Sequence, residues 1–213
     1  MSADAAARGR FITLEGGEGA GKSTQARLLV DALKRAGIEA LATREPGGSP
    51  GAEAIRELLL GGDPDRWDGQ TEALLVVAAR RDHLVHTIRP TLAAGRWVVC
   101  DRYADSTLAY QGYGRGLPLD SLRELHRFIC EEVRHPDLTL ILDLPVEIGL
   151  KRASDRNRFE HLSHDFHERM RQGFLTIAQH APERCVVIDA SGDVESVRRA
   201  LAAAVRERLG VAL

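Results

Sequence analysis

A glycine-rich segment with one lysine and two hydroxyl side chains follows an apolar run near the start of the chain. The run "FITL" leads into "EGGEGAGKST", and "GGEGAGKS" fits the pattern G-x-x-x-x-G-K-[ST]. Glycines allow backbone N–H groups to close around phosphate oxygens, the lysine supplies positive charge, and the serine offers a hydroxyl to Mg²⁺. The predicted ATP-binding residues are Gly16, Gly17, Glu18, Gly19, Ala20, Gly21, Lys22, Ser23 and Thr24.

A glycine-rich turn that binds nothing is the alternative for this segment. The order of elements favours phosphate binding, because the pattern requires a strand before the loop and a helix after it, and the sequence predicts both.

Arginines form the second group of residues that could do chemistry. They stand at predicted strand ends, on a predicted helix and in one polar segment, as Arg44, Arg80, Arg102, Arg152, Arg156 and Arg158. A guanidinium group binds two phosphate oxygens at once, which suits it to a second phosphate-bearing substrate. The loop alone does not identify a reaction, since switches, motors and kinases share it. The sequence has no N-K-x-D stretch of the kind that a guanine-reading switch normally carries.

Short apolar runs alternate with segments of helical spacing, and these elements must position the chemical groups. The runs "FITL", "ALAT", "WVVC", "LTLILDL" and "CVVIDA" are typical of buried strands. The alternation predicts an α/β fold with a parallel five-stranded sheet that helices cover on both faces. The glycine loop, "REPGG" and "DRY" each follow a strand. We expect them to meet at the carboxyl edge of the sheet, where such folds bind ligands.

The bulk composition excludes several classes of protein. A chain of 213 residues with a net charge of −2 has neither the basic surface of a nucleic-acid-binding protein nor a membrane-seeking face. Cys100, Cys130 and Cys185 lack a CxxC or Cys/His pattern, which favours reduced, buried thiols in a cytoplasmic protein. We expect a flexible tail at residues 1–9 and a single domain over residues 10–213.

Beyond the glycine loop, the chain resembles the bacterial form of the thymidylate kinase family. The resemblance rests on "TREPGGSPGAEAIRELLL" (43–60), "AAR" (78–80), "DRYADSTLAYQGYGRGL" (101–117), "PDLTLILDLPVEIGLKRA" (136–153) and "RFE" (158–160). The "DRY…S…AYQG" block is much more specific than the glycine loop. The resemblance implies a P-loop NTPase-type sheet with a short lid at about residues 152–165. It also implies the reaction ATP + dTMP → ADP + dTDP in dTTP synthesis, a Mg²⁺ cofactor and a homodimer.

The resemblance also implies roles at the phosphates. The acceptor is an already ionised phosphate monoester, so the barrier lies mainly in alignment and charge stabilisation. Asp101 would hold the Mg²⁺ shell with Ser23, and Arg102 would clamp the acceptor phosphate; a strand-end ion pair is the alternative. Arg80, on a helix expected over residues 71–89, resembles a second acceptor-phosphate arginine. Glu18 would reach the deoxyribose 3′-hydroxyl, unless it is an ordinary solvated loop acid.

Another set of residues is implied at the sugar and the base. Glu45 and Pro46, in "EPGG", would approach the nucleoside, although a plain turn is the alternative. The Gln111 amide can accept from thymine N3–H and donate to O4, whereas cytosine reverses both hydrogen bonds. Ser106 and Tyr110 resemble base contacts, and Tyr103 resembles a residue that crowds the 2′ position. Ordinary helix packing explains both tyrosines equally well.

One position departs from the family pattern, and another indicates which of the two forms of the family this chain follows. Where an aromatic ring is expected against thymine, this chain has Val76, which can cover a base face but cannot stack. One form of the family has an arginine in the P-loop, but this chain has Gly19 there. The lid arginines Arg156 and Arg158 would therefore stabilise the transferring phosphoryl, and lid closure would exclude water. A solvated charged loop is the alternative for this segment.

Two other functions remain open from the sequence. Another P-loop deoxynucleoside monophosphate kinase would differ at Gln111 and Val76. A non-catalytic ATP-binding module that switches a partner surface would bind ATP without acceptor-dependent turnover. Arg80 and Arg102 argue against the module, because they have no role in it.

Overall fold

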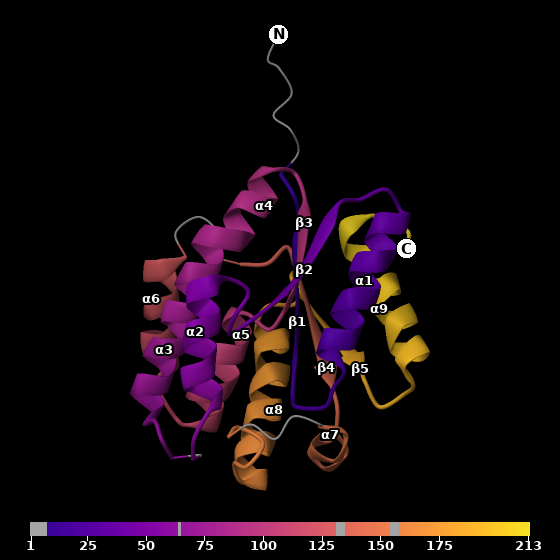
Figure 1. Cartoon of the computed structure of the whole chain (residues 1–213). Helices are drawn as coiled ribbons and strands as arrows, with labels where there is room; N and C mark the ends of the chain where they lie inside the picture. Colours follow the sequence, from indigo (N-terminus) through magenta and orange to yellow (C-terminus); the bar gives the residue numbers. More distant parts are fainter. Residues whose placement is uncertain (1–7, 64, 131–134, 154–157) are drawn as a thin grey trace.

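The computed structural model describes residues 8–63, 65–130, 135–153 and 158–213. It confirms the predicted five-stranded parallel sheet, whose strand order is β2-β3-β1-β4-β5 (Figure 1). The strands are β1 (Phe11–Gly16), β2 (Ala40–Arg44), β3 (Trp97–Asp101), β4 (Leu138–Asp143) and β5 (Cys185–Asp189). The strand that leads into the glycine loop is therefore central, and in the register Leu14 pairs with both Asp101 and Leu140. The strand order reverses beside β1, which is where open parallel sheets bind ligands.

Helices cover both faces of the sheet, as the continuous apolar strands require. On one side, α1 (Lys22–Arg35) and α9 (Val194–Leu209) pack in one apolar cluster with Ile12 and Leu14 of β1. On the other side, α3 (Gly69–His83), α6 (Leu119–Ile129) and α8 (His164–His180) pack around Phe11 and Ile141 (Figure 1). The shorter helices are α2 (Pro50–Leu60), α4 (Arg89–Ala93), α5 (Ala104–Thr107) and α7 (Val146–Arg152).

Two helices contain π-helical turns that the sequence did not predict. The helix expected over residues 71–89 is present, but after α3 it widens into η1 (Leu84–Ile88) before α4 begins. Pro90 explains the change, because it has no N–H to donate and its ring crowds the preceding turn. After β3, α5 passes into the π-helix η2 (Leu108–Gly114), which carries Tyr110 and Gln111.

The segments that carry the chemistry meet at one edge of the sheet. β1, β2 and β3 are parallel, so the glycine loop, "EPGG" and "DRY" leave the sheet on the same side, as predicted. The three cysteines are free and buried. Among the described residues, no helix is both long and apolar enough to cross a membrane. Residues 1–7 of the predicted tail, and residues 154–157 of the predicted lid with Arg156, lie outside the described residues.

Candidate active site

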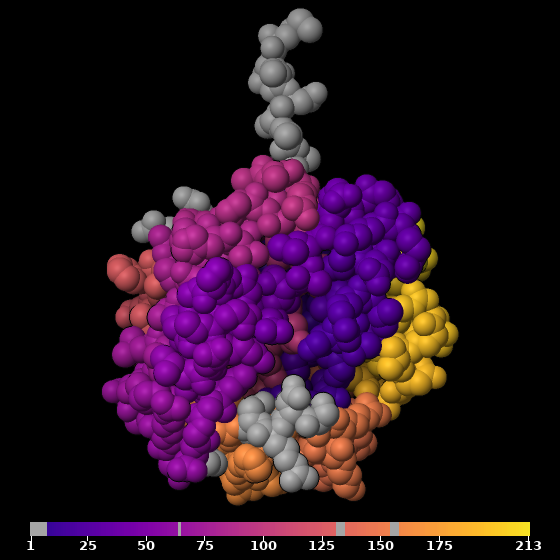
Figure 2. All heavy atoms as spheres, viewed as in Figure 1, coloured from indigo at the N-terminus to yellow at the C-terminus, as the bar shows by residue number. Residues whose placement is uncertain are grey.

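A cavity of about 520 Å³ opens at the carboxyl edge of the sheet. Figure 2 shows the hollow between the indigo residues of the first strand and helix and the purple residues of α2 and α3. Most of the predicted site residues line it, namely Glu18, Gly19, Gly21, Lys22, Ser23, Thr24, Glu45, Pro46, Val76, Arg80, Asp101, Arg102, Tyr103, Ser106, Tyr110 and Gln111. Of the described predicted residues, Gly16, Gly17, Ala20 and Arg158 are not part of its wall. The fold thus brings the glycine loop and the expected acceptor residues to one space.

The glycine loop has a backbone that side chains would not permit. Gly19 has φ +66° and Gly21 has φ +85°, both in the left-handed region. A Cβ atom on Gly19 would lie 2.0 Å from the carbonyl oxygen of Gly149 in α7. A Cβ atom on Gly149 would lie 2.5 Å from the carbonyl oxygen of Glu18. The loop and α7 therefore pack backbone against backbone, and α1 begins directly after the loop, at Lys22.

Lys22 is buried at the base of the loop. Its Nζ donates to the carbonyl oxygen of Gly17 at 2.6 Å. Burial and the nearby Arg102 lower the pKa of Lys22 to about 8, against the attraction of Asp101 and Glu18. A polyanion bound in the glycine loop would stabilise the charged form of Lys22 and raise its pKa again.

Ser23 and Asp101 form a small oxygen cluster beside Lys22. The Ser23 hydroxyl donates to Asp101 Oδ2 across the junction of α1 and β3. One carboxylate and one hydroxyl at a phosphate loop match what Mg²⁺ takes from proteins, which is few carboxylates together with phosphate oxygens and water. The two predicted metal-binding residues therefore fit a magnesium ion.

Arg102 adopts a conformation that is uncommon for a residue with a side chain. Its φ is +72°, and its backbone N–H donates to Leu14 O at 2.9 Å. The guanidinium donates to Gly16 O at 2.9 Å and lies 3.1 Å from Glu18 Oε1. It also lies over the ring of Tyr110, 4.9 Å from the centroid. These contacts hold the cation at the mouth of the phosphate loop.

Glu18 faces this cation from within the loop. Its Oε1 accepts from the hydroxyl of Tyr110 at 2.5 Å. Burial opposes ionisation, but Arg102, Lys22 and the tyrosine hydrogen bond together lower the pKa of Glu18 to about 2. The carboxylate is therefore ionised at neutral pH, and Arg102 and Tyr110 give it the partners that the sequence could not identify.

Glu15 supports the same region and was missed by the sequence analysis. The carboxylate is fully buried at the end of β1, where it accepts from the Tyr103 backbone N–H at 2.8 Å and from Ser106 Oγ at 2.5 Å. Burial and the neighbouring Asp105 raise the pKa of Glu15 to about 7. The only signal in the sequence was an acid at the end of an otherwise apolar run. Glu15 fixes the backbone that follows Arg102.

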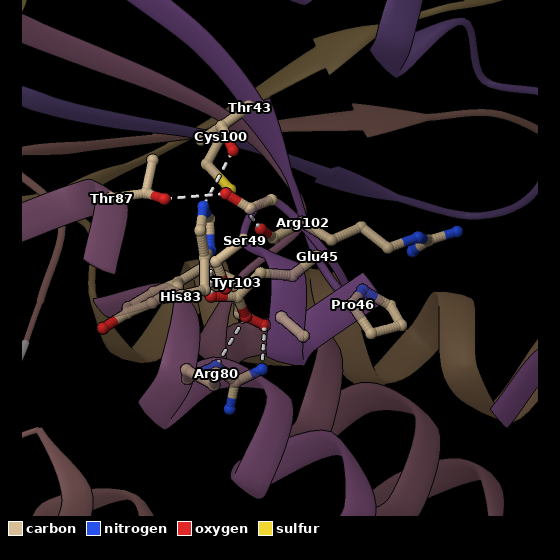
Figure 3. Close-up of polar contacts among 12 residues, drawn as sticks. Thr43, Glu45, Pro46, Ser49, Arg80, His83, Thr87, Cys100, Arg102 and Tyr103 are labelled. Carbon is tan, nitrogen blue, oxygen red and sulfur yellow. Dashed lines mark hydrogen bonds and ion pairs between the residues drawn. The ribbon is translucent and has the colours of Figure 1, made fainter. Parts of the chain in front are cut away.

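Glu45 and Arg80 form a buried ion pair at the cavity wall. Arg80 Nε donates to Glu45 Oε2 at 2.7 Å, and Nη2 donates to Tyr103 O at 2.9 Å. His83 Nδ1 contacts the second Glu45 oxygen at 3.0 Å (Figure 3). Burial opposes the charge, but Arg80 and His83 lower the pKa of Glu45. Arg80 Nη1 is buried and has no hydrogen-bond partner among the described residues.

Arg102 and Arg80 lie on different sides of this cluster. In Figure 3 the Arg102 side chain extends away from Glu45, whereas Arg80 lies directly against it. The two predicted acceptor-phosphate arginines therefore line one cavity from separate positions.

Gln111, the residue predicted to read the base, lines the cavity and is 2% exposed. Its Nε2 donates to Glu72 Oε1 at 2.7 Å. Glu72 is a second buried acid that the sequence analysis missed. Tyr103 is fully buried and packs edge to face on Phe11 with centroids 4.9 Å apart, which supports the packing alternative for this tyrosine. Val76 is half-buried and faces the cavity from α3.

Arg158, one of the two predicted lid arginines, is buried rather than solvated. Its Nη2 lies 2.5 Å from Glu72 Oε2, its Nε donates to Leu59 O at 2.5 Å, and its guanidinium lies over the Phe159 ring. The predicted role at the transferring phosphoryl stays a prediction for Arg158, as it does for Arg156.

The unit of β1, glycine loop and α1 defines a P-loop protein. The cavity that this unit shares with the expected acceptor residues is what a P-loop phosphotransferase needs. The family model described as "Thymidylate kinase" matches residues 14–201. The chain belongs to the thymidylate kinase family, which confirms the resemblance.

Individual relatives agree with the family model over nearly the whole chain. A thymidylate kinase of Caulobacter vibrioides is 55% identical over 207 residues, covering 96% of this chain and 99% of the relative. One of Rhodopseudomonas palustris is 54% identical over 209 residues, covering 95% and 90%. The crystal structure of thymidylate kinase from Ehrlichia chaffeensis matches with a TM-score of 0.77 and 34% identity, covering 93% of this chain and 99% of that one.

Proposed function

We propose that this chain transfers the γ-phosphoryl group of ATP to dTMP, forming ADP and dTDP on the route to dTTP for DNA replication. Family membership supports the reaction, and one observation supports the proposed site: a single cavity is lined by the P-loop and by the expected acceptor residues. ATP and dTMP would therefore bind side by side in the same cavity, so the phosphoryl group could pass directly from one to the other. In-line approach and charge stabilisation are the main requirements of the reaction.

The donor end of the site rests on the backbone of the loop and on Lys22. The backbone N–H groups of the loop and the positive end of α1 would hold the β- and γ-phosphates, with Lys22 beside them. Ser23 and Asp101 would hold Mg²⁺, which neutralises phosphate charge when it is bound. The oxygen donors of these two side chains support this assignment.

The acceptor end rests on Arg102 and Arg80. Arg102 would clamp the dTMP phosphate, because it is already fixed at the mouth of the loop. Arg80 has one buried donor without a partner among the described residues, and it would make the second contact. When the dTMP phosphate binds Arg102, Glu18 would lose that ion pair. Its carboxylate would then accept a hydrogen bond from the sugar 3′-hydroxyl.

The nucleoside would lie against the remaining cavity residues. Gln111 would hydrogen-bond thymine, Val76 and Tyr110 would cover the base, and Ser106 would lie close to it. Glu45, Pro46 and Tyr103 would shape the space around the sugar. Each of these residues lines the cavity. Arg156 and Arg158 are proposed for the transferring phosphoryl, and Arg158 would have to leave Glu72 to reach it.

We also propose that the enzyme is a cytoplasmic homodimer that acts on small nucleotides without a nucleic-acid or membrane partner. Exposed apolar side chains support an interface on the outer surface of α3 and its neighbours. Leu74 on α3 is 59% exposed and Phe128 on α6 is 79% exposed. Sedimentation of the wild type should give twice the 23.3 kDa chain mass, and Leu74→Asp should shift it towards the monomer.

A coupled ATP-consumption assay tests the reaction. The protein is supplied with dTMP, dUMP, dCMP, dGMP or no acceptor, and turnover should be fastest with dTMP. Preference for dCMP would assign another nucleotide kinase, and ATP consumption independent of acceptor would assign an ATPase. ATP binding with no turnover would assign a switch module.

A further inference from the structure

Glu72 joins three segments of the chain behind the base side of the cavity. It lies in the first turn of α3 and is fully buried. Its Oε1 accepts from Gln111 Nε2 at 2.7 Å, and its Oε2 is 2.5 Å from Arg158 Nη2 and 3.2 Å from Arg115 Nη2. The Glu72 carboxylate therefore contacts Gln111 in η2, Arg115 directly after η2, and Arg158.

A carboxylate between two guanidinium groups can only accept hydrogen bonds. The Gln111 amide must therefore turn its NH₂ group, and not its oxygen, towards Glu72. The opposite orientation would place the Gln111 oxygen against Glu72 Oε1 at about the present 2.7 Å, with no proton between them. Both side chains are almost entirely buried, so water cannot relieve this contact. Glu72 thus selects one of the two amide orientations.

We propose that Glu72 is the positioning residue that sets the choice between thymine and cytosine at this site. The inference rests on the proposed function, in which Gln111 reads the base. With one N–H bound to Glu72, the amide presents its oxygen and its second N–H to the cavity in fixed places. Thymine offers N3–H and O4, which match that pair. Cytosine offers an unprotonated N3 and an N4 amino group, and it needs the amide orientation that Glu72 excludes.

Glu72→Gln tests the inference directly. A neutral amide at residue 72 can present either an oxygen or an NH₂ group, so Gln111 becomes free to turn over. The ratio of kcat/KM for dTMP to kcat/KM for dCMP should fall on the order of tenfold, while KM for ATP stays within about twofold. In a Gln111→Leu background, adding Glu72→Gln should leave the ratio unchanged, because the amide through which Glu72 acts is gone.

Asp143→Asn is the matched control. It also removes a carboxylate from a close arginine pair, with Arg171 Nε at 2.7 Å, but Asp143 is not part of the cavity wall. Its ratio should equal that of the wild type even if its thermal stability falls. A similar fall in Asp143→Asn would show that the ratio follows general stability and would overturn the inference.

The outcomes separate this inference from the proposed function. If the wild type does not prefer dTMP, the proposed function fails. If the wild type prefers dTMP and folded Glu72→Gln keeps the full ratio, Glu72 does not position the amide and only the inference fails. Should Glu72→Gln not fold, Glu72→Asp decides, because it keeps the negative charge for the arginines but is one methylene too short to hold Gln111 as well. It should lower the ratio in the same direction, and an unchanged ratio overturns the inference.

Discussion

Arg102 Nη2 lies 3.1 Å from Glu18 Oε1, so the residue after β3 is bound to the carboxylate inside the phosphate loop. The same guanidinium is held by Gly16 O, and its backbone is held in the left-handed region by the neighbouring strand. A dTMP phosphate that binds Arg102, as proposed, would meet a cation whose position is already set. It would have to compete with Glu18 for this cation.

Arg102→Ala should raise KM for dTMP about 100-fold, because hydrogen bonds to charged groups contribute about 1.5–3 kcal/mol each and alanine makes none. KM for ATP should change much less. Initial rates at varied dTMP check this, with Arg123→Ala as the control, since Arg123 lies in an exposed pair with Asp120. Unchanged dTMP saturation in Arg102→Ala would contradict the clamp.

Glu15→Gln should reduce the loss of stability as pH rises from about 5 to 8. The pKa of Glu15 is about 7 in the folded protein, above the 4.5 of an ordinary glutamate, so the folded state binds more protons in this window. The free energy of unfolding therefore falls as pH rises from about 4.5 to 7, and the cost is fully present above 7. A neutral glutamine has no such dependence.

Urea unfolding at pH 5 and pH 8 measures this effect. In the wild type, the free energy of unfolding should fall between pH 5 and pH 8. In Glu15→Gln this fall should be about 1–2 kcal/mol smaller. The exposed Glu124→Gln should behave as the wild type. Equal pH dependence in Glu15→Gln and the wild type would show that Glu15 is not the titrating group.

Gly149→Ala should lower the free energy of unfolding by about 1–3 kcal/mol and weaken ATP binding, because the new methyl group meets a carbonyl oxygen of the phosphate loop. Gly69→Ala is the control, since its nearest atom would lie 3.5 Å away. Denaturant unfolding and ADP titration separate the two effects. Wild-type ADP affinity in Gly149→Ala would mean that the loop absorbs the clash without consequence.

Val76→Phe should lower KM for dTMP about 2- to 10-fold, because a ring facing the cavity can stack on thymine where valine cannot. Steady-state kinetics with dTMP and ATP check this. Val187→Phe, at an exposed position on β5, adds the same ring on the surface and should leave KM unchanged. A higher KM in Val76→Phe would place the base elsewhere in the cavity.

Asp101→Asn should raise the Mg²⁺ concentration that gives half-maximal activity about tenfold, because the amide loses the negative charge that attracts the ion. A Mg²⁺ titration at fixed ATP measures this, with Asp143→Asn as the control. An unchanged titration curve would remove Asp101 from the metal site.

The architecture was readable from the sequence because each strand is a continuous apolar run bounded by polar residues. The glycine loop could be placed on the structure for the same reason, since its pattern is local and its flanking strand and helix are strong. The π-helical turns were not readable, because Pro90 and the glycines of η2 are compatible with several kinds of turn.

The residues that contact the buried acids could not be predicted from the sequence, for a different reason. Glu72 meets Arg158 across 86 positions of the chain, and Glu15 meets Ser106 across 91. Such contacts depend on how helices and loops pack, and an acid in a helix or at a strand end is usually solvated. The sequence therefore predicted which residues face the cavity more readily than which residues hold them there.

The close approach of Gly19 and Gly149 also restricts how the site can move. With the two main chains in direct contact, the donor loop and the helix that leads towards residue 152 form one mechanical unit. A shift of α7 would therefore be transmitted directly to the backbone of the glycine loop, without any side chain between them to absorb it.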